Sequence, residues 1–198
     1  MMIEFWDDRY SQVSYIYGES PNLFFKSFID DEKPGKILLP AEGEGRNAVY
    51  AATKGWEVYA FDQSAIAREK ALKLAKKNNT QINYTKSDAF KFDYQKRKYS
   101  AVGILHFHIP LSYRRPFFNQ IIDCLIPSGK IVIEVFSTII YPDVICGPQL
   151  LELRYEKEEL EEYFNKLNII FSDQLDIVLN EDDFHKGKVN VIRMIVMN

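Results

Sequence analysis

The chain has 198 residues, of which 46% are hydrophobic and 27% are charged, and its formal net charge is -3. This composition is that of an ordinary globular domain and excludes a disordered or fibrous protein. The slight negative charge also argues against a general nucleic-acid binder, because affinity for phosphate backbones comes mainly from clustered lysine and arginine.

Two stretches are nevertheless basic, KALKLAKKNN at residues 70–79 and KFDYQKRKY at residues 91–99. We expect the first to form the solvated face of a helix and the second a connecting loop, with no nucleic-acid partner. No run of about 18 apolar residues exists, so no membrane span is expected. The start, MMIEFWDDRY, is unlike a signal peptide, and Cys124 and Cys146 lack the spacing of metal ligands. We therefore expect no metal site, a cytoplasmic protein, and Cys124 as a small core residue.

The order of the predicted elements indicates an α/β protein. Residues 1–34 predict one or two short helices ahead of the main fold. Hydrophobic patterning then predicts strands at 36–39, 56–62, 82–85, 99–107 and 130–136, and helices at 46–54, 64–77, 115–125 and 156–167. Two final strand-like runs, 169–179 and 188–197, have no room for a helix between them, so they should be antiparallel.

These elements predict one domain over residues 1–198 with a Rossmann-like, doubly wound sheet in three αβα layers. The sheet should have seven strands, mostly parallel, with the C-terminal antiparallel hairpin at its end. In such a sheet a ligand lies at the carboxyl ends of the strands, where the strand order reverses.

A glycine loop follows the first predicted strand. Residues 39–48 read LPAEGEGRNA, and Gly43-x-Gly45-x-x-Ala48 fits the dinucleotide-binding fingerprint. The glycines would let the backbone turn tightly and approach a ligand, although a mere tight turn between strand and helix fits as well.

Two further carboxylates follow the next two strands. Asp62 lies 19 positions after Gly43 (62 minus 43) and could accept hydrogen bonds from ribose hydroxyls, or cap the next helix, for which Ser64 is a candidate N-cap. Asp88 follows the third strand and could accept from an adenine amino group. Because these strand ends share one edge of the sheet, the pattern favours a single nucleoside-bearing ligand.

The charge of the loop selects among nucleosides. Glu42 and Glu44 would repel a pyrophosphate, at a cost of about 3 kcal/mol for each pair of charges roughly 5 Å apart at an effective dielectric near 20. That disfavours NAD and FAD. S-Adenosylmethionine carries an ammonium and a sulfonium and no phosphate, so the acidic loop favours it. Glu42, nearer the strand end, should lie beside the cofactor, and Glu44 should face solvent.

The chain resembles class I S-adenosylmethionine-dependent methyltransferases, most closely their tellurite-resistance-type branch of small bacterial enzymes. The stretches that carry the resemblance are WDDRYS, YIYGESPNLFF, GEGRNAVYAA, FDQS, SDAF, HFHIP with Arg114, and FHKGK. The glycine loop departs from the common pattern at Leu39, Ala41 and Glu42.

The resemblance implies a helical lid over residues 1–34, in which Tyr17, Gly18 and Asn22 close over the methionine part of the cofactor. It implies Asp62, Gln63, Asp88, Ala89 and His106 as further cofactor-binding residues. The other candidates lie in the glycine loop and at the starts of the two helices that follow, namely Glu42, Gly43, Gly45, Asn47 and Ser64. The candidate catalytic residues are His108, which could also be a structural histidine before Pro110, and His185, which could also be mere surface.

We therefore expect transfer of a methyl group to a small-molecule acceptor by in-line displacement, in a monomer or weak homodimer. His108 would act as general base if the acceptor must lose a proton. Two alternatives stay open. One is a non-catalytic S-adenosylmethionine-binding protein, and the other is an NAD(P)-dependent oxidoreductase, which the glycine fingerprint alone would support.

Overall fold

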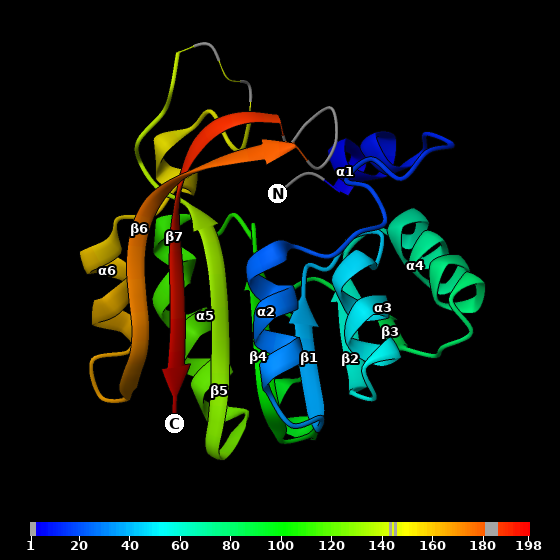
Figure 1. The fold of residues 1–198 in the computed structure, drawn as a ribbon, viewed down its shortest axis with the longest axis horizontal. Helices are drawn as coiled ribbons and strands as arrows, with labels where there is room; N and C mark the ends of the chain where they lie inside the picture. The colour runs from blue at the N-terminus through cyan, green and yellow to red at the C-terminus, as the bar shows by residue number, and fades with distance from the viewer. Residues whose placement is uncertain (1–2, 143, 145, 181–185) are drawn as a thin grey trace. The chain divides into compact units, whose positions relative to one another are not determined.

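The computed structural model of the chain describes residues 3–142, 144, 146–180 and 186–198. It divides into two compact units, residues 1–93 and 94–198. Figure 1 shows the helices and strands of each unit. Within the described residues, no helix is long and apolar enough to cross a membrane.

The first unit contains three parallel strands, β1 (Lys36–Pro40), β2 (Glu57–Asp62) and β3 (Asn83–Lys86), in the order β3-β2-β1. The central residues of β1 are completely buried. Burial on both faces is typical of parallel strands and explains why β1 is a continuous apolar run rather than an alternating one. All three strands lie within one residue of their predicted positions.

Four helices complete this unit: α1 (Ile3–Tyr10), α2 (Leu23–Asp31), α3 (Arg46–Thr53) and α4 (Ala65–Lys77). Asn22 caps α2 by accepting from the Phe25 amide at 3.0 Å, and Ser64 caps α4 by accepting from the Ala67 amide at 3.1 Å, as predicted for Ser64. Helix α3 packs on α2, α4 and β2, and α1 packs on α4. In Figure 1, α1 lies at the end of the unit toward which the arrow of β1 points.

The second unit contains β4 (Tyr99–Leu105), β5 (Leu125–Phe136), β6 (Asn168–Asn180) and β7 (Lys186–Met197), in the order β4-β5-β7-β6. Strands β4 and β5 are parallel, and β7 runs antiparallel to both β5 and β6. The predicted C-terminal antiparallel hairpin is therefore confirmed. Helices α5 (Leu111–Asp123) and α6 (Lys157–Tyr163) and two short 3-10 turns, η1 (Tyr94–Lys96) and η2 (Leu151–Leu153), complete the unit.

The predicted bounds of both helices in this unit are wrong. Helix α5 begins four residues before the predicted start at Arg115, although this places Pro116 inside the helix, where it removes a backbone donor. Helix α6 ends at Tyr163 rather than Leu167, because the completely buried Phe164 packs its ring against that of Phe118, with centroids 5.2 Å apart. In both places tertiary contacts override the local pattern.

Two buried arginines organise the segment between β5 and α6. Arg154 is 4% exposed and donates to the carbonyls of Ser137, Ile139, Cys146 and Pro148. Arg114 is 2% exposed and donates to the carbonyls of Ile109, Glu152 and Arg154. Carbonyls that would otherwise be buried without a partner are thereby satisfied. Cys124 is completely buried, as predicted for a core residue.

Candidate functional site

The ends of the three parallel strands of the first unit are joined by hydrogen bonds. The Glu42 amide donates to the Phe61 carbonyl at 3.1 Å, and the Ser87 amide donates to the Asp62 carbonyl at 2.8 Å. The Gly43 amide donates to Asp62 Oδ2 at 3.1 Å. The glycine loop and the segments that follow β2 and β3 therefore meet at one edge.

Both glycines of the loop occupy left-handed conformations, with φ of 64° at Gly43 and 90° at Gly45. A Cβ built on Gly45 would lie 2.6 Å from Cβ of Ala71, and one on Gly43 would lie 2.8 Å from the Tyr10 hydroxyl. Side chains at these positions would clash as well as strain the backbone. Ala41 also has a left-handed φ, of 51°, so the loop turns tightly at this residue as well.

Glu42 occupies the N-terminus of α3. Its Oε1 accepts from the amides of Asn47 at 2.9 Å and Ala48 at 2.7 Å. The N-cap of this helix is Gly45, which has no side chain to offer. Free amides at a helix N-terminus are the groups that bind a phosphate in a dinucleotide site. Here a carboxylate of the protein already takes two of them.

Glu44 does not face solvent, so that prediction is wrong. It is 4% exposed, and its Oε2 accepts from the Ile16 amide at 2.7 Å. Its Oε1 forms an ion pair with Lys70. Lys70 is only 9% exposed, so the prediction of a solvated face for the basic stretch also fails at this residue.

Asp62 makes the capping-type contact that the sequence left open. Its Oδ1 accepts from the Ser64 amide at 2.9 Å while Oδ2 holds the Gly43 amide. The residue is 7% exposed. Burial raises the pKa of its carboxyl to about 6, against the opposing effect of the backbone hydrogen bonds from Ser64 and Gly43. Each carboxylate oxygen has a second lone pair, so these bonds leave capacity to accept a ribose hydroxyl.

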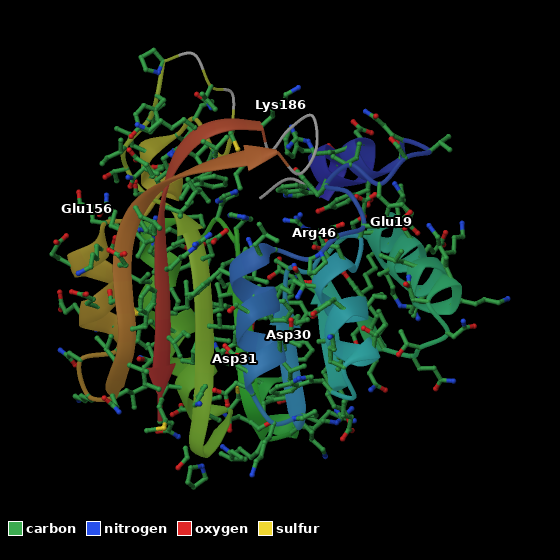
Figure 2. The ribbon with its side chains drawn as sticks, in the orientation of Figure 1. Glu19, Asp30, Asp31, Arg46, Glu156 and Lys186 are labelled. Atoms are coloured by element: carbon green, nitrogen blue, oxygen red, sulfur yellow. The ribbon has the colours of Figure 1, made fainter. Side chains whose placement is uncertain are left out.

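The N-terminal segment is attached to the same loop. The Asn22 amide donates to Asn47 Oδ1 at 2.8 Å, and Arg46 Nη1 donates to the Tyr17 carbonyl at 3.1 Å. Gly18 turns the chain with a φ of 69°. Figure 2 shows Arg46 at the start of α3 and Glu19 in the N-terminal segment at the same end of the unit. The structure thus brings the predicted lid residues to the glycine loop.

The other residues predicted near β2 and β3 have local partners. Ser64 is completely buried, and its hydroxyl both caps α4 and donates to Asp7. Asp88 Oδ1 accepts from the Phe90 amide at 2.7 Å and stabilises a turn. Gln63 and Ala89 are half-buried beside Asp62 and Asp88 in the chain.

Three residues of this edge were not among the predicted site residues. The Tyr84 hydroxyl donates to the Gly43 carbonyl at 2.6 Å, Tyr10 lies over Gly43, and Lys70 binds Glu44. Tyr84 and Lys70 belong to a strand and a helix whose patterning indicates only packing or solvation. Tyr10 falls in the WDDRYS stretch, which was the one available signal.

In the second unit, His106 pairs with a buried carboxylate. His106 Nε2 lies 3.3 Å from Glu134 Oε1, and Arg193 Nε donates to Glu134 Oε2 at 2.6 Å. Glu134 is completely buried. His106 has a positive φ of 51°, and its ring stacks on Phe136 with centroids 4.7 Å apart. Such strain at a strand end is typical of functional positions.

The His108 ring also stacks on Phe136, with centroids 5.9 Å apart. His185 lies outside the described residues.

The acidic loop predicts an unusual pH dependence of stability. Burial raises the pKa of Glu42 to about 7, from 4.5 for a free glutamate. The folded state therefore binds this proton more tightly than the unfolded chain, and the stability it contributes is lost as the pH rises toward 7. For the ligand-free protein we expect Glu42 to contribute about 2 kcal/mol less at pH 7.5 than at pH 5.

Urea unfolding of the wild type and Glu42→Gln at both pH values measures this effect, because glutamine does not titrate. The variant should lose less stability than the wild type between pH 5 and 7.5. Equal losses in the two proteins would show that Glu42 titrates normally.

Comparison with known proteins identifies a domain within the chain. Residues 37–129 match a family model described as a methyltransferase domain. No curated protein matches the chain by sequence.

Solved structures match almost the whole chain. TehB from Haemophilus influenzae gives a TM-score of 0.74 at 15% identity over 98% of this chain and 66% of that chain, so the present chain spans just under two thirds of that protein. A structure from work on the conversion of a disulfide bond into a thioacetal group during echinomycin biosynthesis gives 0.76 at 16% identity, over 100% and 92%. The N-methyltransferase NodS from Bradyrhizobium japonicum, in complex with S-adenosylhomocysteine, gives 0.70 at 9% identity, over 99% and 97%.

These likenesses show the fold, which is the Rossmann-like α/β fold with a C-terminal antiparallel hairpin, as the sequence predicts. Magnesium protoporphyrin IX methyltransferase from Synechocystis is another solved structure that matches, and like NodS it has S-adenosylhomocysteine bound.

Proposed function

We propose that this chain is an S-adenosylmethionine-dependent methyltransferase that acts on a small-molecule acceptor, in the tellurite-resistance-type branch that its sequence resembles. The observation that carries the proposal is the position of Glu42 at the N-terminus of α3, where it accepts from the amides of Asn47 and Ala48. A dinucleotide would bring its pyrophosphate to those amides, and the Glu42 side chain already occupies two of them. A cationic, phosphate-free nucleoside meets no such obstacle.

The side chains at the strand ends of the first unit could bind this cofactor. Asp62 would accept hydrogen bonds from the ribose hydroxyls, and Asp88 with Ala89 would bind the adenine. Glu42 would lie near the cationic methionine part, with Tyr17 above it. When bound, S-adenosylmethionine supplies a methyl group already activated on a sulfonium, so the protein has mainly to align the acceptor, which by itself can contribute about 7 kcal/mol or more.

We keep His108 as the candidate general base for an acceptor that must lose a proton, such as a thiol, hydroxyl or ammonium, because a neutral imidazole can accept one. An acceptor that is already an anion, such as a chalcogen oxyanion, would not need it. His185 stays a candidate for the mouth of the pocket on the strength of the resemblance alone.

Titration calorimetry with S-adenosylmethionine, S-adenosylhomocysteine and NADH tests the cofactor. We expect the two sulfur nucleosides to bind and NADH not to bind. Binding of NADH alone would support an oxidoreductase instead. Methyl transfer is then assayed with a panel of thiols, selenite, tellurite and small amines, and nucleoside binding without transfer to any of them would favour a non-catalytic binding protein.

A further inference from the structure

Lys70 of α4 is a buried cation surrounded by backbone carbonyls. Its Nζ donates to the carbonyl of Tyr10 at 3.2 Å, of Gln12 at 2.9 Å and of Ser14 at 2.6 Å. It also forms the ion pair with Glu44. An ammonium has three hydrogens, so these four acceptors saturate it. Burying a charge costs several kcal/mol unless partners compensate it in this way. Lys70 therefore differs from the solvated lysines around it, whose charges water compensates.

Glu44, the partner of Lys70, binds the next residues of the N-terminal segment. Its Oε2 accepts from the amides of Ile16 at 2.7 Å and Tyr17 at 3.5 Å. The Tyr15 hydroxyl donates to the Lys70 carbonyl at 3.0 Å. The cation therefore binds carbonyls of residues 10–14, and the anion binds the amides that follow. One ion pair holds the backbone of residues 10–17 on both sides.

The segment held in this way covers the glycine loop. The Tyr10 hydroxyl lies within van der Waals reach of Gly43, and the Tyr10 ring stacks on Trp6 with centroids 5.6 Å apart. Glu44 belongs to the loop itself, and Ala71, the neighbour of Lys70, packs against Gly45. The loop, α4 and the N-terminal segment thus share a single buried contact.

We propose that Lys70 and Glu44 are positioning residues that fix residues 10–17 over the glycine loop, so that one wall of the cofactor site is assembled before the cofactor binds. This inference depends on the proposed function only for the identity of the ligand, which is taken to be S-adenosylmethionine. If residues 10–17 are ordered before binding, less conformational entropy is lost when the ligand binds. If the ordered form is only a fraction of the molecules, the apparent affinity falls by that fraction.

The test compares Lys70→Met with the wild type in two measurements. Hydrogen exchange of the ligand-free protein should be at least about tenfold faster for peptides covering residues 10–17 in the variant. The carbonyls in this segment lose the donor that orders them, and Glu44, which accepts from the Ile16 and Tyr17 amides, loses its counter-ion. Calorimetry should show S-adenosylhomocysteine binding weakened about tenfold or more. In a methyl-transfer assay KM for S-adenosylmethionine should rise while kcat stays within about twofold, since neither residue is placed at the reacting atoms.

Lys77→Met is the matched control. Lys77 lies on the same helix and pairs with Glu19 Oε2, two residues beyond that segment, at 2.6 Å, but its side chain is 63% exposed. Exposed ion pairs contribute little, so this variant should change exchange and affinity by no more than about twofold. Lys70→Arg keeps the charge and should recover part of both effects.

Two outcomes would overturn the inference: a folded Lys70→Met that keeps wild-type exchange and affinity, or Lys77→Met with effects as large as those of Lys70→Met. If Lys70→Met does not fold, Glu44→Gln decides. It keeps an acceptor for the Ile16 amide but removes the charge, and it must speed exchange at residues 10–17 for the inference to stand. The exchange measurements use no ligand, so they judge the ion pair even if the wild type binds no S-adenosylhomocysteine and the proposed function fails.

Discussion

Asp62→Asn should bind S-adenosylhomocysteine about 30- to 100-fold more weakly than the wild type at pH 7.5. At that pH the carboxylate is ionised, because its pKa is raised only to about 6. Hydrogen bonds from two ribose hydroxyls to a charged acceptor contribute about 2 to 2.7 kcal/mol more than those to an amide, which converts to this loss. Titration calorimetry measures it.

The stability of the ligand-free protein separates this role from simple capping. Asparagine keeps one acceptor oxygen for the Gly43 or Ser64 amide and removes a buried charge, so the free energy of unfolding should change by no more than about 1 kcal/mol. A large loss of stability with little loss of affinity would show that Asp62 serves the loop and not the ligand.

Asp88→Asn is the comparison variant for Asp62→Asn. Its amide oxygen can still accept from the Phe90 amide or from an adenine amino group, so affinity should fall about threefold or less.

Arg114→Met should destabilise the protein by about 3 to 5 kcal/mol. The guanidinium lies over the Tyr155 ring, 4.0 Å from its centroid, and pairs with Glu159 Oε2 at 2.6 Å. Methionine fills part of the volume but removes the donor of three carbonyls, two of them buried, and of Glu159 Oε2. Removing one partner of a buried ion pair is the costly way to break it. Urea unfolding, followed by circular dichroism, measures the loss.

Arg115→Met provides the control for Arg114→Met at the adjacent position. Arg115 is paired with Glu162 at 3.1 Å, but both side chains are more than half exposed. Surface pairs contribute about 1 kcal/mol at most, so this variant should unfold close to the wild type. Similar losses for the two arginines would mean that burial is not what makes Arg114 important.

The strands were predictable because their signals are local. Ile37 to Leu39 form an apolar run bounded by a lysine and a proline, which is typical of a buried parallel strand. The last two strands have no room for a crossover between them, so they must pair antiparallel. The start of α5 was not predictable in this way. Pro116 marks a helix start locally, yet the contacts of Arg114 with residues up to 45 positions away hold the helix from Leu111.

Local and long-range signals also separate the residues of the candidate site. The position of Asp62 beside the glycine loop was predictable from its spacing, since one helix sets the distance from a glycine loop to the end of the next strand. The surroundings of Glu44 and Lys70 were predicted wrongly, because a charged residue in a polar stretch is solvated by default and only a distant partner can justify its burial. Their partners lie 26 and more residues away along the chain.

The sequence alone determined the order and type of the strands, the closing hairpin, and an acidic glycine loop that favours a cation over a pyrophosphate. Only the tertiary structure decided what each carboxylate of that loop does: Glu42 fills the N-terminus of α3, while Glu44 joins Lys70 to hold the N-terminal segment. The physical reason is that backbone patterning is read from neighbours in the chain, whereas a buried charge is stable only where residues from separate segments converge on it.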